Sequence, residues 1–257
     1  MNTLDRLAIQ TGASVRESLQ SIGKSFIFLT KTFSCKFHFD LTVRQMYELG
    51  VCSFPLILFV SIFSGFISIL TYLEVTNNLH AAPILMGRMV GTTIFIEIGP
   101  AIVGLILSAR LAARITAQIG TMKITEQLDA MVCLSLNPFE YIIQPRIIAS
   151  VLMSPVFFVF SSLLAIISAQ MLSTFIYGLT PLTFYNGMRY GFSHMDIVTG
   201  MVKVIIFTTI NVFVGCLYGM NVSGGAQYVG KATRNAVVSS SLFILVANLT
   251  ISMLFFS

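Results

Sequence analysis

Charged residues are scarce in this sequence. Asp, Glu, Lys and Arg make up 10% of the 257 residues, and hydrophobic residues make up 56%, whereas soluble domains carry about 25% charged residues. Several uncharged runs reach the roughly 20 residues that a helix needs to cross a bilayer. The scarcity of charge therefore excludes an ordinary soluble domain and predicts an all-α polytopic membrane protein.

Cysteine and histidine are also too few and too scattered to build a site. They are far apart along the chain, with no C-x-x-C pair and no metal-ligand spacing: Cys35, Cys52, Cys133, Cys216, His38, His80 and His194. This distribution excludes a disulfide framework and a zinc site. Neither a Ser–His–Asp nor a Cys–His arrangement can be drawn, so we expect no catalytic residue, no metal and no bound cofactor in this chain.

The first 45 residues lack a bilayer-length apolar run but carry a helical stripe. Apolar residues recur there at steps of three and four: Val15, Leu19, Ile22, Phe26, Leu29 and Phe33. Such a stripe with cations elsewhere on the helix is typical of a helix in the headgroup plane, and a helix packed on a soluble partner is the alternative. The first strongly apolar run begins near Phe54, too late for a cleaved signal peptide, so we expect it to act as its own insertion signal.

Residues 46–257 are predicted to form a single transmembrane domain. Five apolar runs predict its spans: 54–73, 84–108, 147–179, 197–222 and 236–257. The third run exceeds thirty residues, so it must tilt, project from the bilayer or bend at Pro155. Lys203 lies close enough to the start of the fourth run to snorkel. The intervening segments are expected to be a polar connector or exposed: 42–50, 74–83, 110–146, 180–196 and 223–234.

Lys and Arg are distributed unequally between the two sides that five spans define. Most of them fall in the N-terminal region and in segments 110–146 and 223–234. Cytoplasmic loops carry the excess of such cations, which predicts a cytoplasmic N-terminus and an external C-terminus. We attribute the net charge of +5 to topology and lipid headgroups and expect no nucleic-acid partner. No internal repeat typical of secondary transporters is visible.

Glu97 is the most informative single residue, because it lies near the middle of the second predicted span. A carboxylate in the bilayer centre costs about 2.5–3.5 kcal/mol on insertion scales, so it should face protein or a water-accessible cavity. A structural role, hydrogen-bonding between helices, is the alternative. Pro100 follows three residues later and should kink the helix there.

Two further segments combine polar and apolar residues. Residues 121–136 have the spacing of an amphipathic helix, with Glu126 and Asp129 on one face and a stop at Asn137-Pro138. Residues 225–233 nearly spell a phosphate-binding P-loop, but Ala232 occupies the position of the required hydroxyl and a span precedes it. We therefore expect no nucleotide site in this chain, and any ATPase that drives it must be a separate subunit.

Several motifs in order give the chain a family resemblance. They are EIGP (97–100), SAR (108–110), GTMK (120–123), TEQLDA (125–130), NP (137–138), QPR (144–146) and GGAQYVGKATRNAV (224–237). From about residue 45 onward the chain closely resembles the MlaE family. These proteins are permease subunits of ABC transporters that move phospholipids across bacterial and plastid envelopes. Two positions depart from the family pattern: Ile96 replaces a common polar residue, and Gln118 replaces a common glutamate.

The resemblance implies partners and sites beyond what spacing predicts. It implies a homodimer in the bacterial inner membrane that binds a cytoplasmic ATPase, which carries ATP and magnesium, and an external MCE-domain lipid-binding protein. It places phospholipid in a cavity near Glu97, Gly99, Pro100 and Arg110. It assigns ATPase coupling to Met122, Lys123, Thr125, Glu126, Gln127 and Asp129. The alternative function is an ion- or proton-coupled secondary transporter that uses Glu97 as its titrating group.

Overall fold

The computed structural model describes residues 38–76, 83–191 and 193–256, and the described chain is helical, without strands. The α-helices are α2 (Phe39–Gln45), α3 (Phe54–Thr76), α4 (Pro83–Thr93), α5 (Gly99–Leu107), α6 (Ala113–Ile124), α7 (Gln127–Cys133), α8 (Gln144–Tyr177), α9 (Pro181–Gly191), α10 (His194–Met220) and α11 (Ala226–Phe256). Short 3-10 and π-helical segments join some of them: η1 (Met46–Gly50), η2 (Val51–Ser53), η3 (Ile94–Ile98), η4 (Ser108–Ala112) and η5 (Phe139–Ile143). The predicted amphipathic stripe over residues 15–33 lies outside the described residues.

Five helical runs are long and apolar enough to cross a membrane, which confirms the predicted fold class. They are Phe39–Tyr72, Leu85–Ile124, Phe139–Ile176, His194–Met220 and Ala226–Phe255. The second run has 40 residues and is about 60 Å long at 1.5 Å per residue, twice the roughly 30 Å of the hydrocarbon core. It therefore extends well beyond the bilayer core.

Four segments expected to be connectors or loops contain helix instead. Residues 42–50 continue from α2 through η1 toward α3, and α9 occupies most of 180–196. Helix α6 continues directly from the second span, with Ile115 and Ile119 fully buried. Helix α11 begins at Ala226 rather than near residue 236. Three of these segments continue the helix of an adjacent span, and α9 is a separate helix after the end of α8 at Tyr177. A polar composition therefore did not mark the end of helix.

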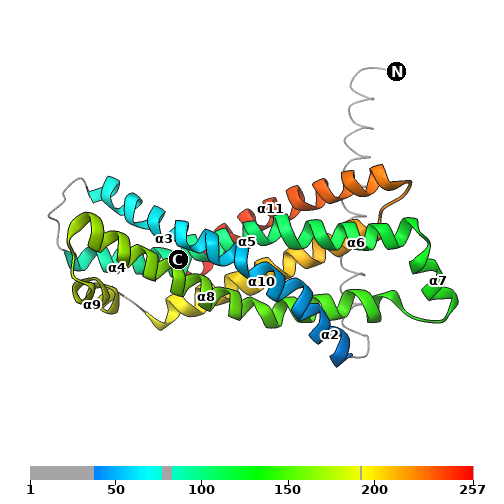
Figure 1. Ribbon diagram of the computed structural model, residues 1–257, viewed down its shortest axis with the longest axis horizontal. Coiled ribbons are helices and arrows are strands. Elements are labelled where there is room, and N and C mark those ends of the chain that lie inside the picture. The colour runs from blue at the N-terminus through cyan, green and yellow to red at the C-terminus, as the bar shows by residue number, and fades with distance from the viewer. Residues whose placement is uncertain (1–37, 77–82, 192, 257) are drawn as a thin grey trace, which may run out of the picture.

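The bundle is elongated, with different helices at its two ends (Figure 1). Helix α7 and the turn before it lie at one end, and the pair α4–α9 lies at the other. Helix α8 has 34 residues and continues through Pro155, so it is about 51 Å long and projects beyond the hydrocarbon core. Helix α7 ends at Cys133, before the stop predicted at Asn137-Pro138. Asn137 Oδ1 accepts a hydrogen bond from the Phe139 N–H at 3.1 Å where η5 begins.

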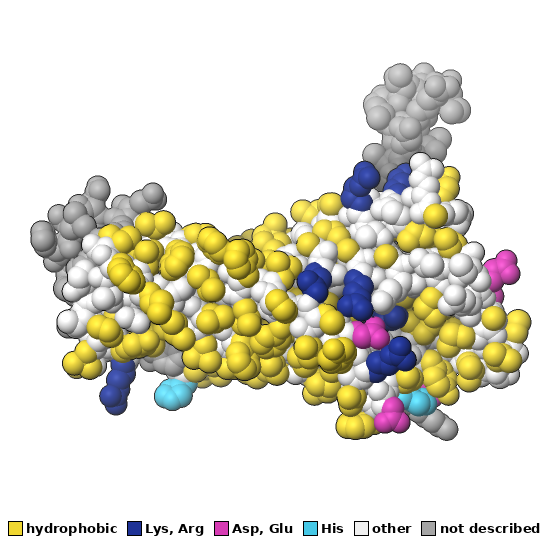
Figure 2. All heavy atoms as spheres, in the orientation of Figure 1, with side chains coloured by type: hydrophobic (Ala, Val, Ile, Leu, Met, Phe, Trp, Pro, Cys, Tyr) yellow, Lys and Arg dark blue, Asp and Glu magenta, His cyan; other side chains and the backbone are white. Residues whose placement is uncertain are grey.

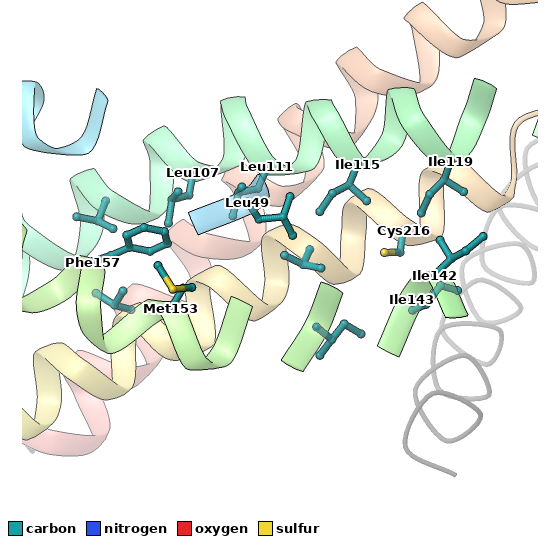
Figure 3. Close-up of a cluster of buried hydrophobic side chains, with 14 of the residues drawn as sticks. Leu49, Leu107, Leu111, Ile115, Ile119, Ile142, Ile143, Met153, Phe157 and Cys216 are labelled. Carbon is teal, nitrogen blue, oxygen red and sulfur yellow. The ribbon is translucent and has the colours of Figure 1, made fainter. Parts of the chain in front are cut away.

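The largest core joins the first four spans (Figure 3). One face of the helix from α5 to α6 contributes Leu107, Leu111, Ile115 and Ile119, which face side chains of the neighbouring helices. All four are at most 1% exposed. Because α5 and α6 belong to one continuous helical run, this core holds that run in place along much of its length.

Small residues allow the first and third spans to approach closely. A Cβ added to Gly65 on α3 would lie 2.1 Å from the carbonyl oxygen of Ala165 on α8, so only glycine fits there. Buried serines nearby hydrogen-bond to carbonyls of their own helix, as Ser61 does to Ile57 at 2.7 Å. Backbone contact through small residues is typical of helix packing in lipid.

Candidate functional site

Glu97 lies in η3, the π-helical segment between α4 and α5, and it is surrounded by α10 and α11. Its Oε1 accepts hydrogen bonds from Lys203 Nζ at 3.0 Å and from Ser252 Oγ at 2.5 Å. Its Oε2 accepts a hydrogen bond from Asn248 Nδ2 at 3.0 Å. Three side chains from two other spans thus hold the carboxylate, and both of its oxygens accept hydrogen bonds.

Lys203 is a full member of this site and does not reach the membrane surface. Its side chain is completely buried, and its ammonium donates to Glu97, to Ser252 Oγ at 2.7 Å and to the Ile96 carbonyl at 2.8 Å. These three acceptors match the three donors of an ammonium group. The expectation that Lys203 snorkels is therefore wrong, because its ammonium is held inside the bundle by Glu97, Ser252 and the Ile96 carbonyl.

Pro100 explains why the Ile96 carbonyl is available to Lys203. Proline has no backbone N–H and therefore cannot donate to the carbonyl four residues earlier, which is that of Ile96. The Lys203 ammonium donates to that carbonyl instead. Gly99 is buried beside the proline, and a Cβ there would lie 2.4 Å from the Ile94 carbonyl oxygen. Gly99 and Pro100 thus shape the backbone under Glu97.

Gly200 sets the distance between α10 and the segment that carries Glu97. A Cβ on Gly200 would lie 2.3 Å from the Phe95 carbonyl oxygen and 2.7 Å from the ring of Phe158. The absence of a side chain lets the two backbones meet. Lys203 follows less than one turn later on α10, so this close approach brings its ammonium to Glu97.

The cluster is closed on one side and open on the other. Lys203 is fully buried, whereas 42% of the Glu97 side chain is exposed in the single chain. Asn248 and Ser252 come from α11, of whose most apolar stretch only 17% is buried. Large apolar side chains cover its outer face, among them Leu242, Leu245, Val246 and Leu249. The carboxylate therefore borders a surface that a lipid or another protein can cover.

Arg110 is not part of this cluster. It lies thirteen residues after Glu97 on the same helical run, which corresponds to about 20 Å. Its guanidinium donates to the carbonyl of Cys52 at the start of the first span. Of the four residues predicted near the lipid, the structure brings together Glu97, Gly99 and Pro100 and separates Arg110 from them.

Sequence reasoning missed three residues of the site: Lys203, Asn248 and Ser252. Asn248 and Ser252 are four residues apart on α11, and such residues share a helix face. This spacing of two polar residues within an apolar span was the available signal. The partner of that face could not be read from the sequence, because spacing along one helix does not specify which helix lies opposite.

The predicted coupling segment is a helix–turn–helix and not one continuous helix over 121–136. Helix α6 ends at Ile124, and Glu126 adopts a left-handed conformation with φ of 60° before α7 begins. Lys123 Nζ forms an ion pair with Asp129 Oδ1 at 3.1 Å across this turn. The two carboxylates consequently do not share a helix face, because Glu126 precedes α7 in a left-handed conformation and only Asp129 lies within α7.

One buried residue anchors this exposed turn. Leu128 is 2% exposed and belongs to the main core, whereas Val132 and Leu134 are 60% and 72% exposed. The predicted coupling residues lie together at this end of the bundle. Thr125, Glu126, Gln127 and Asp129 are exposed, and Met122 and Lys123 are half-buried. The turn thus presents polar and apolar side chains at this end of the bundle, directly after the helical run that contains the Glu97 segment.

The fold and these two sites define a multi-pass membrane protein with a polar cluster inside its spans. Residues 42–254 match the model of the family described as permease MlaE. The chain therefore belongs to the MlaE permease family.

Relatives of this chain occur in bacteria and plants. It is 30% identical over 242 residues to a probable ABC transporter permease of Rickettsia bellii, covering 92% of this chain and 93% of the relative. It is 30% identical to a probable ABC transporter permease of Synechocystis over 217 residues, covering 84% and 81% of the two chains. It is 28% identical over 225 residues to the chloroplastic protein TRIGALACTOSYLDIACYLGLYCEROL 1 of Arabidopsis thaliana, covering 86% of this chain and 63% of that protein. These similarities identify the chain as an ABC transporter permease.

Proposed function

We propose that this permease moves phospholipids between the inner and outer membranes of a bacterial envelope, driven by a separate cytoplasmic ATPase. The observation that carries the proposal is the half-exposed Glu97 carboxylate, which is fixed by Lys203, Asn248 and Ser252 beside an apolar surface. A phospholipid needs an apolar surface for its chains and polar groups for its headgroup. Both are adjacent here.

Force would enter through the turn between α6 and α7. The turn is anchored by Leu128, and the helical run Leu85–Ile124 links it to the Glu97 segment. The link spans 27 residues, or about 40 Å. Closure of an ATPase that holds ATP and magnesium would move this turn, and the connected helix would change the space around Glu97. The ATPase is proposed to bind on the cytoplasmic side, where cations concentrate.

A homodimer would cover the open side of the Glu97 cluster. The outer face of α11 is apolar and largely exposed in the single chain. A second copy of the chain on this face would enclose lipid between two such clusters. An MCE-domain protein at the external end would receive or deliver the lipid.

Charge reversal of the turn tests the coupling proposal. Glu126→Lys/Asp129→Lys should abolish recovery of an ABC ATPase when the protein is isolated from its native membrane in detergent, because both exposed carboxylates change sign. Bound proteins and lipids are identified by mass spectrometry. Glu140→Lys, a charge reversal at a half-buried carboxylate outside the turn, is the matched control and should retain the ATPase.

The same isolation separates lipid transport from gradient-driven transport. Recovery of ATPase, MCE-domain protein and phospholipid with the unmodified chain supports the proposal. Isolation of a stable, lipid-poor chain without an ATPase would contradict it and favour the ion-coupled transporter. The match to the permease family and to probable ABC transporter permeases supports the proposal over that alternative.

A further inference from the structure

A second polar site lies between α2, α6 and α8, away from the Glu97 cluster. It is a pocket of about 590 Å³, lined among others by Arg44, Gln45, Glu48, Gln118, Thr121 and Arg146. Gln118 follows Glu97 by 21 residues on one helical run, so the two sites are about 30 Å apart. Figure 2 shows Lys and Arg side chains gathered around an acidic one on this face of the molecule.

Arg146 is the unusual member of this pocket. The residue is only 7% exposed. Its Nη1 reaches the Ile142 carbonyl at 3.4 Å, and its Nη2 reaches Gln118 Oε1 at 3.3 Å. Its Nε has no hydrogen-bond partner within the described parts of the chain. Both acceptors are neutral, and both distances are long for hydrogen bonds. Arg146 is therefore a buried cation at the edge of the pocket whose N–H groups could donate further hydrogen bonds.

The charges around the pocket leave a positive surplus. Glu48 pairs with Arg44 at 3.2 Å and with Arg114 at 3.5 Å. One carboxylate therefore stands among three guanidinium groups, counting Arg146, and these four residues sum to +2. An anion in the pocket would balance this surplus.

The pocket lies beyond the apolar run of the second span. Gln118 and Thr121 lie eight and eleven residues beyond Arg110, which corresponds to about 12–17 Å along the helix. Arg110 itself is the first cation after the apolar run of the second span. The pocket thus lies outside the hydrocarbon core, at the end that the distribution of Lys and Arg predicts to be cytoplasmic.

We propose that this pocket binds a phosphate-bearing anion through Arg146 and Arg44, and that the anion is the headgroup of an anionic phospholipid of the cytoplasmic leaflet. Guanidinium groups bind phosphate through paired, charge-assisted hydrogen bonds, and the amide of Gln45 can donate another. The anion would join α2 to α6 and α8. The proposal is independent of lipid transport through the Glu97 cluster.

The absence of tryptophan from the sequence allows a direct test. Leu41 also lines the pocket, and Leu41→Trp would place the only tryptophan of the full chain there. The protein is reconstituted into phosphatidylcholine nanodiscs with increasing fractions of phosphatidylglycerol, and tryptophan emission is followed. A parallel titration adds inorganic phosphate to nanodiscs of phosphatidylcholine alone. Saturable emission changes with phosphatidylglycerol are expected.

Three variants on the Leu41→Trp background determine whether the pocket causes the response. Arg44→Gln should weaken apparent binding at least about fivefold, since one charge-assisted contact is lost, and the 75% exposed Arg44 side chain makes a folding defect unexpected. Gln118→Glu should weaken it similarly by supplying Arg146 with an internal carboxylate. Arg234→Gln removes an exposed cation on α11, outside the pocket, and should leave binding unchanged.

The outcomes are distinct. A response to inorganic phosphate but not to phosphatidylglycerol would support a phosphate site and overturn the lipid as its occupant. An equal loss with Arg234→Gln and Arg44→Gln would mean attraction by surface charge in general and overturn the pocket. No response to either probe would overturn the proposal entirely. None of these results depends on whether the chain transports lipid.

Discussion

Replacing Glu97 by alanine is expected to lower the free energy of unfolding by about 3–5 kcal/mol. The variant leaves the ammonium of Lys203, which is fully buried, without its counter-ion, and breaking a buried ion pair by removing one partner has costs of this size. Unfolding of the detergent-solubilised chain by a denaturing detergent measures the change. Transport should be lost as well, because the only carboxylate of the cluster is removed.

A double variant distinguishes two causes of the lost stability: the unpaired charge of Lys203 and the missing side-chain volume at position 97. Glu97→Ala/Lys203→Met also removes the buried cation and should recover at least half of the lost stability. Asp129→Ala is the control, because its ion pair is 62% exposed on the Asp129 side and exposed pairs contribute about 0–1 kcal/mol. A double variant no more stable than Glu97→Ala would show that the pair is not what stabilises this region.

The same substitution at two glycines is expected to have opposite effects. Gly200→Ala should destabilise the chain by about 1–3 kcal/mol, because its Cβ would lie 2.3 Å from the Phe95 carbonyl oxygen and force α10 away. Gly230→Ala should stabilise it by about 0.5–1 kcal/mol, since nothing lies within 4 Å of its Cβ and alanine favours helix more than glycine. Both are measured by the same unfolding assay.

The Gly200→Ala variant also tests how the cluster is assembled. If the close approach at Gly200 brings Lys203 to Glu97, then moving α10 away should weaken the ion pair and reduce transport. Stability changes of equal sign and size at Gly200 and Gly230 would contradict this account of the packing.

The spans could be predicted from the sequence because a helix in the hydrocarbon core needs a bilayer-length run of apolar residues. A charge-free run of bilayer length has one common explanation, so the number of spans was predicted correctly. Helix ends outside the bilayer are not marked by a change in hydrophobicity. The extension of α11 to Ala226 and the existence of α9 depend on backbone hydrogen bonding that polar sequences also satisfy.

The candidate site was predictable only in part. Glu97 could be singled out because an ionisable residue within a span requires a partner. The identity of the partner could not be derived, because Lys203 is 106 residues away along the chain and the pairing of spans is a property of packing. The turn at Glu126 was missed because a left-handed residue in an otherwise helical pattern has no strong signal when it is not glycine or asparagine.

The π-helical segment η3 has a consequence for how this chain tolerates insertions and deletions. A π turn holds about one residue more than the α turn it replaces, so deleting one residue from 94–98 would convert the π turn of η3 into an α turn and leave α4 and α5 facing their present neighbours. The same deletion inside α4 or α5, which have no extra residue, would turn the two sides of the helix by about 100° relative to each other. Related sequences should therefore differ in length by one residue at η3 more readily than within α4 or α5.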